Sequence, residues 1–348
     1  MKTRVIRVNK DNPDLKKIRI AAKVIKNGGL VAFPTETVYG LGANTFDRDA
    51  VSNIFKAKNR PKDNPLIVHI ADPDDVYKLA RDIPECVNML TCAFWPGPLT
   101  LLLKKAEHVP RPKGIDEVTL RMPSHPVALA LIRESGVPIS APSANLSGGV
   151  SPTTAQHVYN DLKGRIDVIL DAGPTDVGVE STIVDLTGVI PVILRPGGVT
   201  YEDLKKVLGK VDVHPVAKAE TKIEVKAKAP GMKYTHYAPR AQVILVEGNI
   251  KKMIEKMREL INEYTQEGLN VGVMATAETA AFYSQGVVKV VGSREDLKTV
   301  AKNLFQILRE FDTEGVDIIV AEGVVTKEIG LAIMNRLRKS AGFNITYV

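Results

Sequence analysis

The chain has 348 residues, of which 44% are hydrophobic, 25% charged and 5% aromatic. This composition excludes disordered, collagen-like and coiled-coil proteins, and at roughly 150 residues per domain the length predicts two domains. The formal net charge of +7 favours anionic ligands such as nucleotides, phosphates or RNA, although a lysine-rich solvated surface explains the charge equally well.

The sequence shows no membrane or export signal. Its longest apolar runs, such as 99–103 and 316–320, are far shorter than the roughly 20 residues that cross a bilayer. The N-terminal residues lack the apolar core of a secretory signal, so we expect a cytoplasmic protein. Cys86 and Cys92 lie on one predicted helix, too far apart for a disulfide, and are expected to be buried thiols.

The first predicted element is a helix that starts with Asn12 as its cap and Pro13 as its first residue, and ends at Gly28. Short apolar runs then recur between helical patterns. They predict strands at 30–33, 66–70, 99–103, 118–122, 137–140, 168–170, 182–186 and 192–194. Because their spacing is too irregular for a repeating βαβ array, we expect a twisted, mixed sheet flanked by helices.

Residues 215–240 are rich in Lys, Ala and Pro and have no hydrophobic period, which predicts a linker. Beyond it, strands at 243–246, 271–274, 287–291 and 316–321 alternate with helices at 251–267, near 278, at 294–311 and at 327–339. This alternation is typical of a parallel, doubly wound sheet. The predicted organisation is an α/β domain at 1–214, a linker at 215–240, and a smaller Rossmann-like α/β domain at 241–348.

Several common site motifs are missing from the sequence. There is no P-loop, and Gly40-Leu41-Gly42 lacks the third glycine of a dinucleotide fingerprint. The six histidines are dispersed and no C-x-x-C occurs, which argues against a zinc site. A nucleotide site must therefore be built in another way.

Polar residues instead follow the predicted strands of the first domain. Thr35, Glu36 and Thr37 come after the strand at 30–33, and a stretch at 56–65 holds several cations and two prolines. A stiff basic loop of this kind can hold a triphosphate. An ordinary turn and a solvated basic loop are the respective alternatives.

Further polar segments follow later strands. Small hydroxyl residues, an amide and glycines fill 140–151, and two shorter polar segments occupy 180–182 and 195–198. Backbone N–H groups and hydroxyls in such segments can hold phosphate. Arg121 lies in a strand suited to burial and therefore needs an anionic or polar partner. His69 also lies in an apolar strand, where a histidine is more commonly a core residue than a ligand-binding one. Together the segments predict one shared polar ligand site.

In this order the segments resemble the two-domain threonylcarbamoyl-AMP synthases, whose catalytic part has the YrdC-like fold. The matching motifs are P-T-E-T-x-Y-G-L-G at 34–42, K-x-R-P at 58–61, N-P-L at 64–66, S-A-P-S-A-N-x-S-G at 140–148, E-S-T-I-V-D at 180–185, R-P-G at 195–197 and K-Y-T-H-Y-A-P at 233–239. The resemblance runs from about residue 10 to the C-terminus.

The resemblance implies a nucleotidyltransferase that forms threonylcarbamoyl-AMP and pyrophosphate from L-threonine, bicarbonate or CO₂, and ATP. Mg²⁺ is expected to accompany the ATP, held by phosphates and water because the motif loops offer few carboxylates. The product would pass to a separate transferase complex that modifies tRNA next to the anticodon. The resemblance does not say whether this chain binds tRNA itself.

The resemblance also assigns site residues. It implies a catalytic tetrad of Lys58, Arg60, Ser143 and Asn145. L-Threonine would be held by Thr35, His69, Arg121, the Ala141 backbone and Ser181. The nucleotide would be held by Arg60, Asn64, Thr119, Ser143, Ser151, Arg195 and, from the linker, Tyr234. No residue is assigned as a metal ligand, and the second domain is expected to act as a lid through the linker.

Two other functions remain open at this stage. One is a non-catalytic protein that binds double-stranded RNA or tRNA through the basic loop, although scarce aromatic residues and small polar motif residues suit a small ligand better. The other is a carbamoyl-transferring maturation enzyme with a related domain. That enzyme carries zinc-finger cysteines, which this chain lacks.

Overall fold

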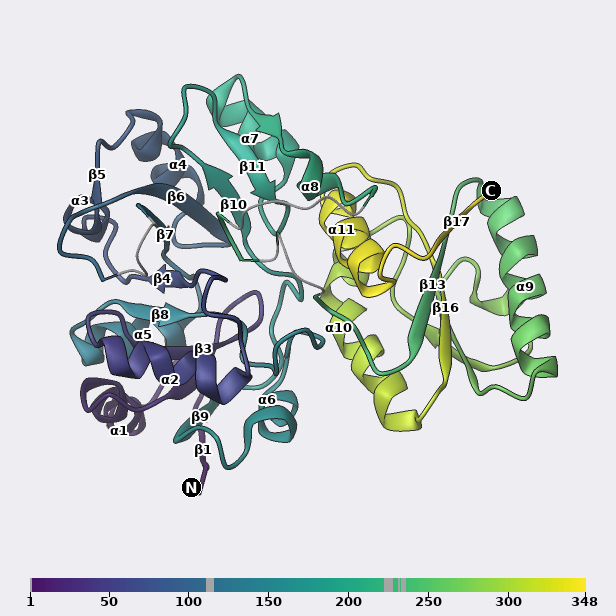
Figure 1. The fold of residues 1–348 in the computed structure, drawn as a ribbon, viewed down its shortest axis with the longest axis horizontal. Helices are drawn as coiled ribbons and strands as arrows, with labels where there is room; N and C mark the ends of the chain where they lie inside the picture. The colour runs from purple at the N-terminus through teal and green to yellow at the C-terminus, as the bar shows by residue number, and fades with distance from the viewer. Residues whose placement is uncertain (1, 111–115, 222–227, 231, 233–235) are drawn as a thin grey trace.

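The computed structural model describes residues 2–110, 116–221, 228–230, 232 and 236–348. Two sheets lie side by side, each flanked by helices (Figure 1). The larger sheet is mixed and the smaller is parallel, which confirms the predicted fold class.

The larger sheet has twelve strands in the part of the chain that the structure describes. Parallel and antiparallel pairs occur in it together; for example, β2 pairs antiparallel with β3 and parallel with β9. In spatial order the strands are β1 (Arg4–Arg7), β9 (Val168–Asp171), β2 (Val31–Pro34), β3 (Tyr39–Asn44), β8 (Ile139–Ala141), β4 (Ile67–His69), β7 (Glu117–Arg121), β6 (Leu99–Lys105), β10 (Thr182–Asp185), β11 (Val192–Arg195) and β12 (Asp212–Val213), with β5 (Ala80–Arg81) paired to β6.

Helices cover both faces of this sheet, because its strands are apolar on both sides. Along β2, Val31 and Phe33 pack with α1 (Leu15–Lys26) and α5 (Pro126–Ser135). Ala32, which points the opposite way, packs with α2 (Arg48–Lys58) and α6 (Ala155–Leu162). The remaining helices of this part of the chain are α3 (Asp75–Leu79), α4 (Cys86–Phe94), α7 (Tyr201–Leu208) and α8 (Pro215–Lys218).

The smaller sheet is parallel throughout. Its spatial order is β15 (Val287–Val290), β14 (Val271–Ala275), β16 (Ile318–Glu322), β13 (Gln242–Glu247) and β17 (Ile345–Tyr347). Helix α9 (Ile250–Gln266) covers one face, and α10 (Leu297–Glu314) and α11 (Gly330–Ser340) cover the other. The face with α10 and α11 is turned toward the larger sheet (Figure 1).

One buried apolar cluster contains residues from both halves of the molecule. Val38, Val150 and Val179, which belong to the first half, pack in the same buried cluster as Leu304 and Phe305 of α10. Charged contacts join the halves as well. The second sheet and its helices are therefore packed against the loops of the first.

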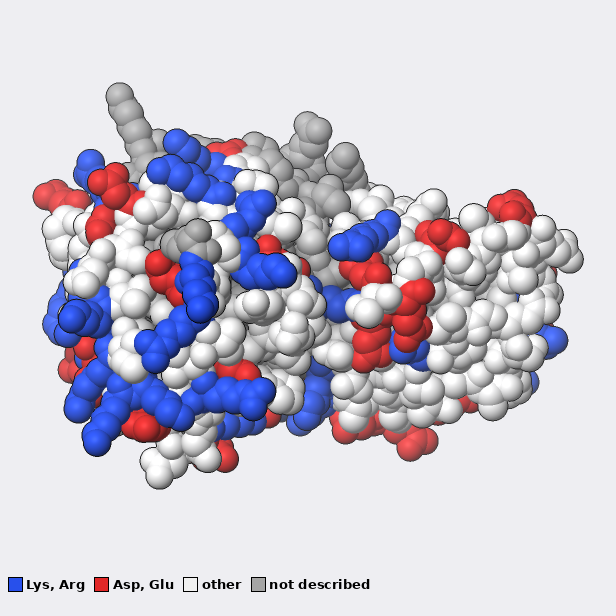
Figure 2. Space-filling view, turned by 90° about the horizontal axis from the view of Figure 1, so that it is seen from below, with Lys and Arg blue, Asp and Glu red and all other residues white. Residues whose placement is uncertain are grey.

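Charge is unevenly distributed over the surface. On the face shown in Figure 2, Lys and Arg gather over the first half of the molecule, while Asp and Glu lie along the adjoining part of the second. The net positive charge of the sequence is thus concentrated, on this face, on the part that carries the motifs.

Three local predictions are wrong. Helix α1 begins at Leu15, because the Asp14 side chain accepts a hydrogen bond from the Lys16 N–H and caps it. Strand β3, Tyr39–Asn44, was not predicted. Near Glu278 there is only a 3₁₀ turn, Ala280–Phe282, and strands β1, β5, β12 and β17 were not predicted.

The difference at β3 has a physical origin. Gly42 fits in β3 because a Cβ there would lie 2.5 Å from Cγ2 of Ile139, so any side chain at this position would force its neighbours to move. The expected buried thiols are also absent, since Cys86 is half-buried and Cys92 exposed, with both free.

Candidate active site

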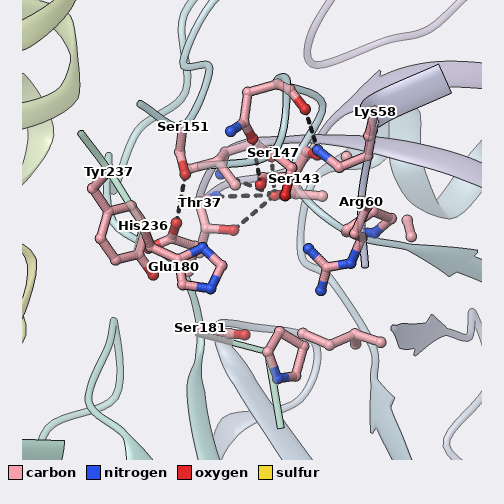
Figure 3. Close-up of a pocket in the computed structure, with 18 of the residues that line it drawn as sticks. Thr37, Lys58, Arg60, Ser143, Ser147, Ser151, Glu180, Ser181, His236 and Tyr237 are labelled. Atoms are coloured by element: carbon pink, nitrogen blue, oxygen red, sulfur yellow. Dashed lines mark hydrogen bonds between the residues drawn. The ribbon is translucent and has the colours of Figure 1, made fainter. Parts of the chain in front are cut away.

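A pocket in the first half of the molecule brings most of the predicted site residues together (Figure 3). Its volume is about 690 Å³ with the open side included. The predicted residues that line it are Thr35, Lys58, Arg60, His69, Arg121, Ala141, Ser143, Asn145, Ser151, Ser181 and Arg195. The segments form one polar cavity, and the individual roles of the residues stay predictions.

Lys58 fixes the loop that carries Ser143 and Asn145. It is the last residue of α2, is 1% exposed, and its ammonium donates to the carbonyl oxygens of Ser143, at 2.6 Å, and of Asn145. Burial, followed by the nearby Arg60, lowers its pKa well below the usual range. Lys58 thus acts on the protein backbone in this structure.

Arg60 shapes the basic loop. Its guanidinium donates to the carbonyl oxygens of Asn64 at 3.3 Å and Pro65 at 3.0 Å, while the residue lines the pocket opposite His236 and Tyr237 (Figure 3). The two prolines limit the freedom of the loop. The cation is therefore held at one wall of the cavity.

The loop after β8 is held by its own polar groups. The Ser143 hydroxyl donates to Oδ1 of Asn145 at 2.6 Å, and the Asn145 amide donates to the carbonyl oxygens of Leu146 and Gly149. The backbone carbonyl oxygen of Tyr39 in β3 accepts a hydrogen bond from the Ala144 N–H at 2.8 Å. These bonds explain why a hydroxyl, an amide and glycines occur together in this segment.

Arg121 finds its anionic partner in Glu36. One guanidinium nitrogen lies 2.8 Å from Oε1 of Glu36, and the two side chains are 4% and 8% exposed. The contact is not aligned for a hydrogen bond, and neither atom has another hydrogen-bond partner. The guanidinium therefore keeps donor capacity for a ligand carboxylate.

His69 is buried beside Arg121. Its ring meets Phe33 edge to face with centroids 5.9 Å apart, and Nδ1 has no hydrogen-bond partner. Burial, followed by the charge of Arg121, lowers the pKa of His69 to about 3. The imidazole is therefore neutral near neutral pH, and the residue lines the pocket.

The other predicted threonine-binding hydroxyls are engaged within the protein. Thr35 Oγ1 donates to the Val38 carbonyl at 2.6 Å. Ser181 Oγ lies 2.7 Å from Thr100 Oγ1 and accepts from Arg195 at 3.1 Å. Burial lowers the pKa of Arg195 to about 10, so its guanidinium stays charged at neutral pH.

Ser151 and Glu180 form one side of the cavity. The Ser151 hydroxyl donates to Oε1 of Glu180 at 2.6 Å (Figure 3), and Oε2 of Glu180 accepts from Arg336 at 2.8 Å. Burial by itself would raise the pKa of the Glu180 carboxyl, but the guanidinium groups of Arg336 and Arg195 outweigh it and the pKa is lowered. Glu180 is thus an ionised acceptor.

Two of the predicted residues that the structure describes are not among the lining residues. Thr119 donates its hydroxyl to the Leu66 carbonyl at 2.8 Å and so supports the sheet. Asn64 is 1% exposed, with no partner for either amide atom. Tyr234 lies outside the described residues.

Other lining residues were not predicted as site residues. They include Thr37, Ser147, Glu180, His236 and Tyr237. All five lie inside the motifs that carry the family resemblance, so the motifs themselves were the available signal. His236 is neutral, since burial and then Arg60 lower its pKa to about 3.

Two observations bear on metals and membranes. Within the described ranges, no three His, Cys, Asp or Glu side chains come together in an arrangement that could hold a metal ion. In the same ranges, the helices are too short or too polar for any of them to cross a bilayer.

Comparisons with known proteins match both halves of the chain. The Sua5/YciO/YrdC family model, described as telomere recombination, matches residues 23–197, and the model described as the threonylcarbamoyl-AMP synthase C-terminal domain matches residues 199–342. The chain is 53% identical over 334 residues to a threonylcarbamoyl-AMP synthase of Pyrococcus abyssi, covering 95% of this chain and 96% of that protein.

Two further relatives agree. A threonylcarbamoyl-AMP synthase of Bacillus subtilis is 51% identical over 325 residues, which is 92% of each chain. The solved structure of P. abyssi Sua5 complexed with L-threonine superposes with a TM-score of 0.93 at 51% identity, covering 99% of each chain.

Proposed function

This chain belongs to the family of two-domain threonylcarbamoyl-AMP synthases, and from that membership we propose that the pocket of Figure 3 is its active site. The chain is a nucleotidyltransferase that makes threonylcarbamoyl-AMP. We take the substrates to be L-threonine, ATP with its Mg²⁺, and bicarbonate or CO₂. Residues 1–214, 215–240 and 241–348 are our division into catalytic domain, linker and second domain.

The observation that carries the proposal is that groups suited to two kinds of ligand line one cavity. Arg121 and the neutral His69 lie in paired strands, β7 and β4, at the inner wall. Arg60 and Arg195 add two further cations to the same cavity. An amino acid and a triphosphate can therefore be held next to each other.

L-Threonine suits the inner wall. Its carboxylate can pair with Arg121, which retains donor capacity beside Glu36. Its hydroxyl and amine can meet the hydroxyls of Thr35 and Ser181 and the free nitrogen of His69. The likeness to a relative that binds L-threonine supports this placement.

ATP suits the cationic side. Arg60 and Arg195 can neutralise charge that develops on the phosphates, an effect worth a few kcal/mol for each well-placed donor. Lys58 contributes by holding the carbonyl oxygens of Ser143 and Asn145, so that this loop keeps its shape around the phosphates. Mg²⁺ enters as part of the nucleotide substrate.

The chemistry then depends on positioning. The threonine amine adds to CO₂ with loss of a proton, or to bicarbonate with loss of water, to give a carbamate. The carbamate oxygen then attacks the α-phosphorus as pyrophosphate leaves. No protein nucleophile is needed for this sequence of steps. The acyl adenylate must then be consumed by an enzyme that transfers the threonylcarbamoyl group to tRNA, and we place both steps in the cytoplasm.

The direct test is pyrophosphate release from purified protein supplied with ATP, Mg²⁺, bicarbonate and L-threonine. We expect release only when threonine and bicarbonate are both present, with serine as the matched control for threonine. Release that does not depend on threonine, or salt-sensitive tRNA binding with no release at all, would contradict the proposal.

A further inference from the structure

One residue of the second domain reaches the active site through a chain of contacts. Arg336 lies on α11, is fully buried, and its Nε donates to Oε2 of Glu180 at 2.8 Å. Oε1 of Glu180 accepts from the Ser151 hydroxyl at 2.6 Å. Ser151 and Glu180 both line the pocket, whereas Arg336 stands behind them.

The direction of these hydrogen bonds restricts what Ser151 can offer a ligand. An ionised carboxylate only accepts hydrogen bonds, so the one hydroxyl proton of Ser151 is committed to Glu180. The lone pairs of Ser151 Oγ remain available. Toward the cavity this side chain is therefore an acceptor, which suits a donor group and does not suit a phosphate oxygen.

The charge of Glu180 leads to the same conclusion. Arg336 and Arg195 offset much of the charge of Glu180, but a carboxylate at the wall still attracts N–H and O–H donors rather than phosphate oxygens. In Figure 3, Ser151 and Glu180 lie across the cavity from Lys58 and Arg60. The nucleoside part of ATP, with its ribose hydroxyls and its 6-amino group, supplies donors on that side.

Arg336 is held firmly by the second domain. Its guanidinium lies 5.2 Å from the centre of the Tyr237 ring, which stacks on Phe305 of α10. It also donates to the Asn335 side chain, which in turn donates to the Ala217 carbonyl at 2.8 Å. The cation that orients Glu180 is thus fixed by several contacts.

The second domain also packs against the residues that directly precede Ser151 and Glu180 in the chain. Val150 and Val179, the residues next to Ser151 and Glu180, pack in the buried cluster formed by α10 and α11. Arg309 of α10 donates to the Val150 carbonyl and pairs with Asp161 at 2.7 Å. Gly178 approaches α10 so closely that a Cβ would lie 2.4 Å from Cα of Lys302.

We propose that Arg336 is a positioning residue for the nucleotide site: it orients Glu180 so that Ser151 presents its oxygen as an acceptor to a donor group on the nucleoside part of ATP. The second domain thereby takes part in choosing the nucleotide. The inference depends on the proposed function only in taking ATP as the ligand of this pocket.

The test measures binding by calorimetry without threonine, so that no turnover is needed. The ligands are ATP, 2′-deoxy-ATP, 3′-deoxy-ATP and purine riboside triphosphate, which lacks the 6-amino group, with inorganic tripolyphosphate as the probe for the phosphate half. The wild-type protein is expected to bind at least one analogue about tenfold more weakly than ATP, a difference of about 1.4 kcal/mol. The analogue that loses affinity identifies the donor as a ribose hydroxyl or the amino group.

Arg336→Gln should bind ATP about tenfold more weakly, lose the discrimination between ATP and that analogue, and bind tripolyphosphate as the wild type does. Arg338→Gln is the matched control, because Arg338 lies on the same helix and pairs with Glu247 at 2.6 Å, away from the pocket. We expect it to keep both affinity and discrimination. Unchanged ATP binding in Arg336→Gln, or an equal loss for ATP and tripolyphosphate, would overturn the proposal.

A double variant covers the case in which Arg336→Gln does not fold. Glu180→Gln with Arg336→Gln removes both buried charges at once. If Arg336 acts through Glu180, this double variant binds ATP no more weakly than Glu180→Gln alone. A further drop would show that Arg336 acts by another route. Threonine-dependent pyrophosphate release by the wild type is measured separately, so a failure of the proposed function is distinguishable from a failure of this inference.

Discussion

The buried pair of Glu36 and Arg121 allows a sharp test of how the pocket binds threonine. Glu36→Gln keeps the size of the side chain but leaves the Arg121 guanidinium, which is 4% exposed, without a counter-ion. Removing one partner of a buried pair costs about 3–5 kcal/mol. We expect about 3 kcal/mol here, because the amide oxygen still faces the guanidinium.

Thermal unfolding gives the readout. For a domain of this size about 1 kcal/mol shifts Tm by roughly 2–4 °C, so Glu36→Gln should lower Tm by about 6–12 °C. Saturating L-threonine should then raise the Tm of the variant more than that of the wild type, because the ligand carboxylate supplies the missing negative charge.

The control removes the same charge from a partly exposed pair. Glu134 pairs with Arg19 at 2.9 Å, and the arginine side chain is 61% exposed. Glu134→Gln should therefore cost under about 1 kcal/mol and leave the threonine shift unchanged. Our account of the inner wall is refuted if Glu36→Gln behaves like this control, or if threonine stabilises Glu36→Gln less than it stabilises the wild type.

Three further predictions concern the cationic wall and the domain boundary. Arg60→Ala should slow pyrophosphate release by about 10²–10³-fold with little change in far-ultraviolet circular dichroism. Lys62→Ala is the control, because Lys62 is an exposed neighbour on the same loop, and it should not slow release. Near-normal release by Arg60→Ala would contradict the role of this cation. Burial, followed by the charge of Arg336, lowers the pKa of Lys339 from 10.5 to about 7. Between pH 7 and pH 10.5 the unfolded chain therefore binds more protons than the folded one, and the free energy of unfolding rises with pH. Lys339→Met removes the buried charge, so it should raise Tm most near pH 6 and no longer raise it at about pH 10.5. A change in Tm that does not depend on pH would contradict this prediction. Gly178→Ala places a Cβ against the backbone of α10 at a φ of +80°, and this left-handed conformation alone costs about 1–2 kcal/mol. The variant should weaken ATP binding more than threonine binding in calorimetry. Equal losses of affinity for the two ligands would argue against a local effect.

The sequence could predict the polar cavity because its residues occur in compact motifs at the ends of short strands. Lys58 and Arg60 lie two residues apart, as do Ser143 and Asn145, and each pair is rigid once its own loop is formed. The parallel sheet was predictable for a similar reason, since the alternation of strands and helices is a local signal.

The remaining features depend on contacts between residues far apart in the chain. Arg121 clearly needed a partner, but nothing local pointed to Glu36, 85 positions earlier. Thr119 resembles a binding hydroxyl in the sequence, yet in the sheet it completes the hydrogen bonding of Leu66. In the sequence Arg336 looks like an ordinary helix cation, and only the fold places it beside Glu180. Strand β3 could not be predicted from its glycines, because the close packing of Gly42 against Ile139 joins residues far apart in the chain.

The shared core between the two halves has a consequence for the order in which the protein matures during synthesis. All the strands of the larger sheet precede α10 in the chain, and roughly 120 residues separate Val179 from that helix. At about 5–20 residues per second, the ribosome needs about 6–24 s to make this stretch. A nascent chain would pass through this interval with Val150 and Val179 uncovered. Arg336 lies on α11 and is made later still, so Glu180 stays without this counter-ion for longer, and the nucleotide side of the pocket is completed only after α11 has been synthesised.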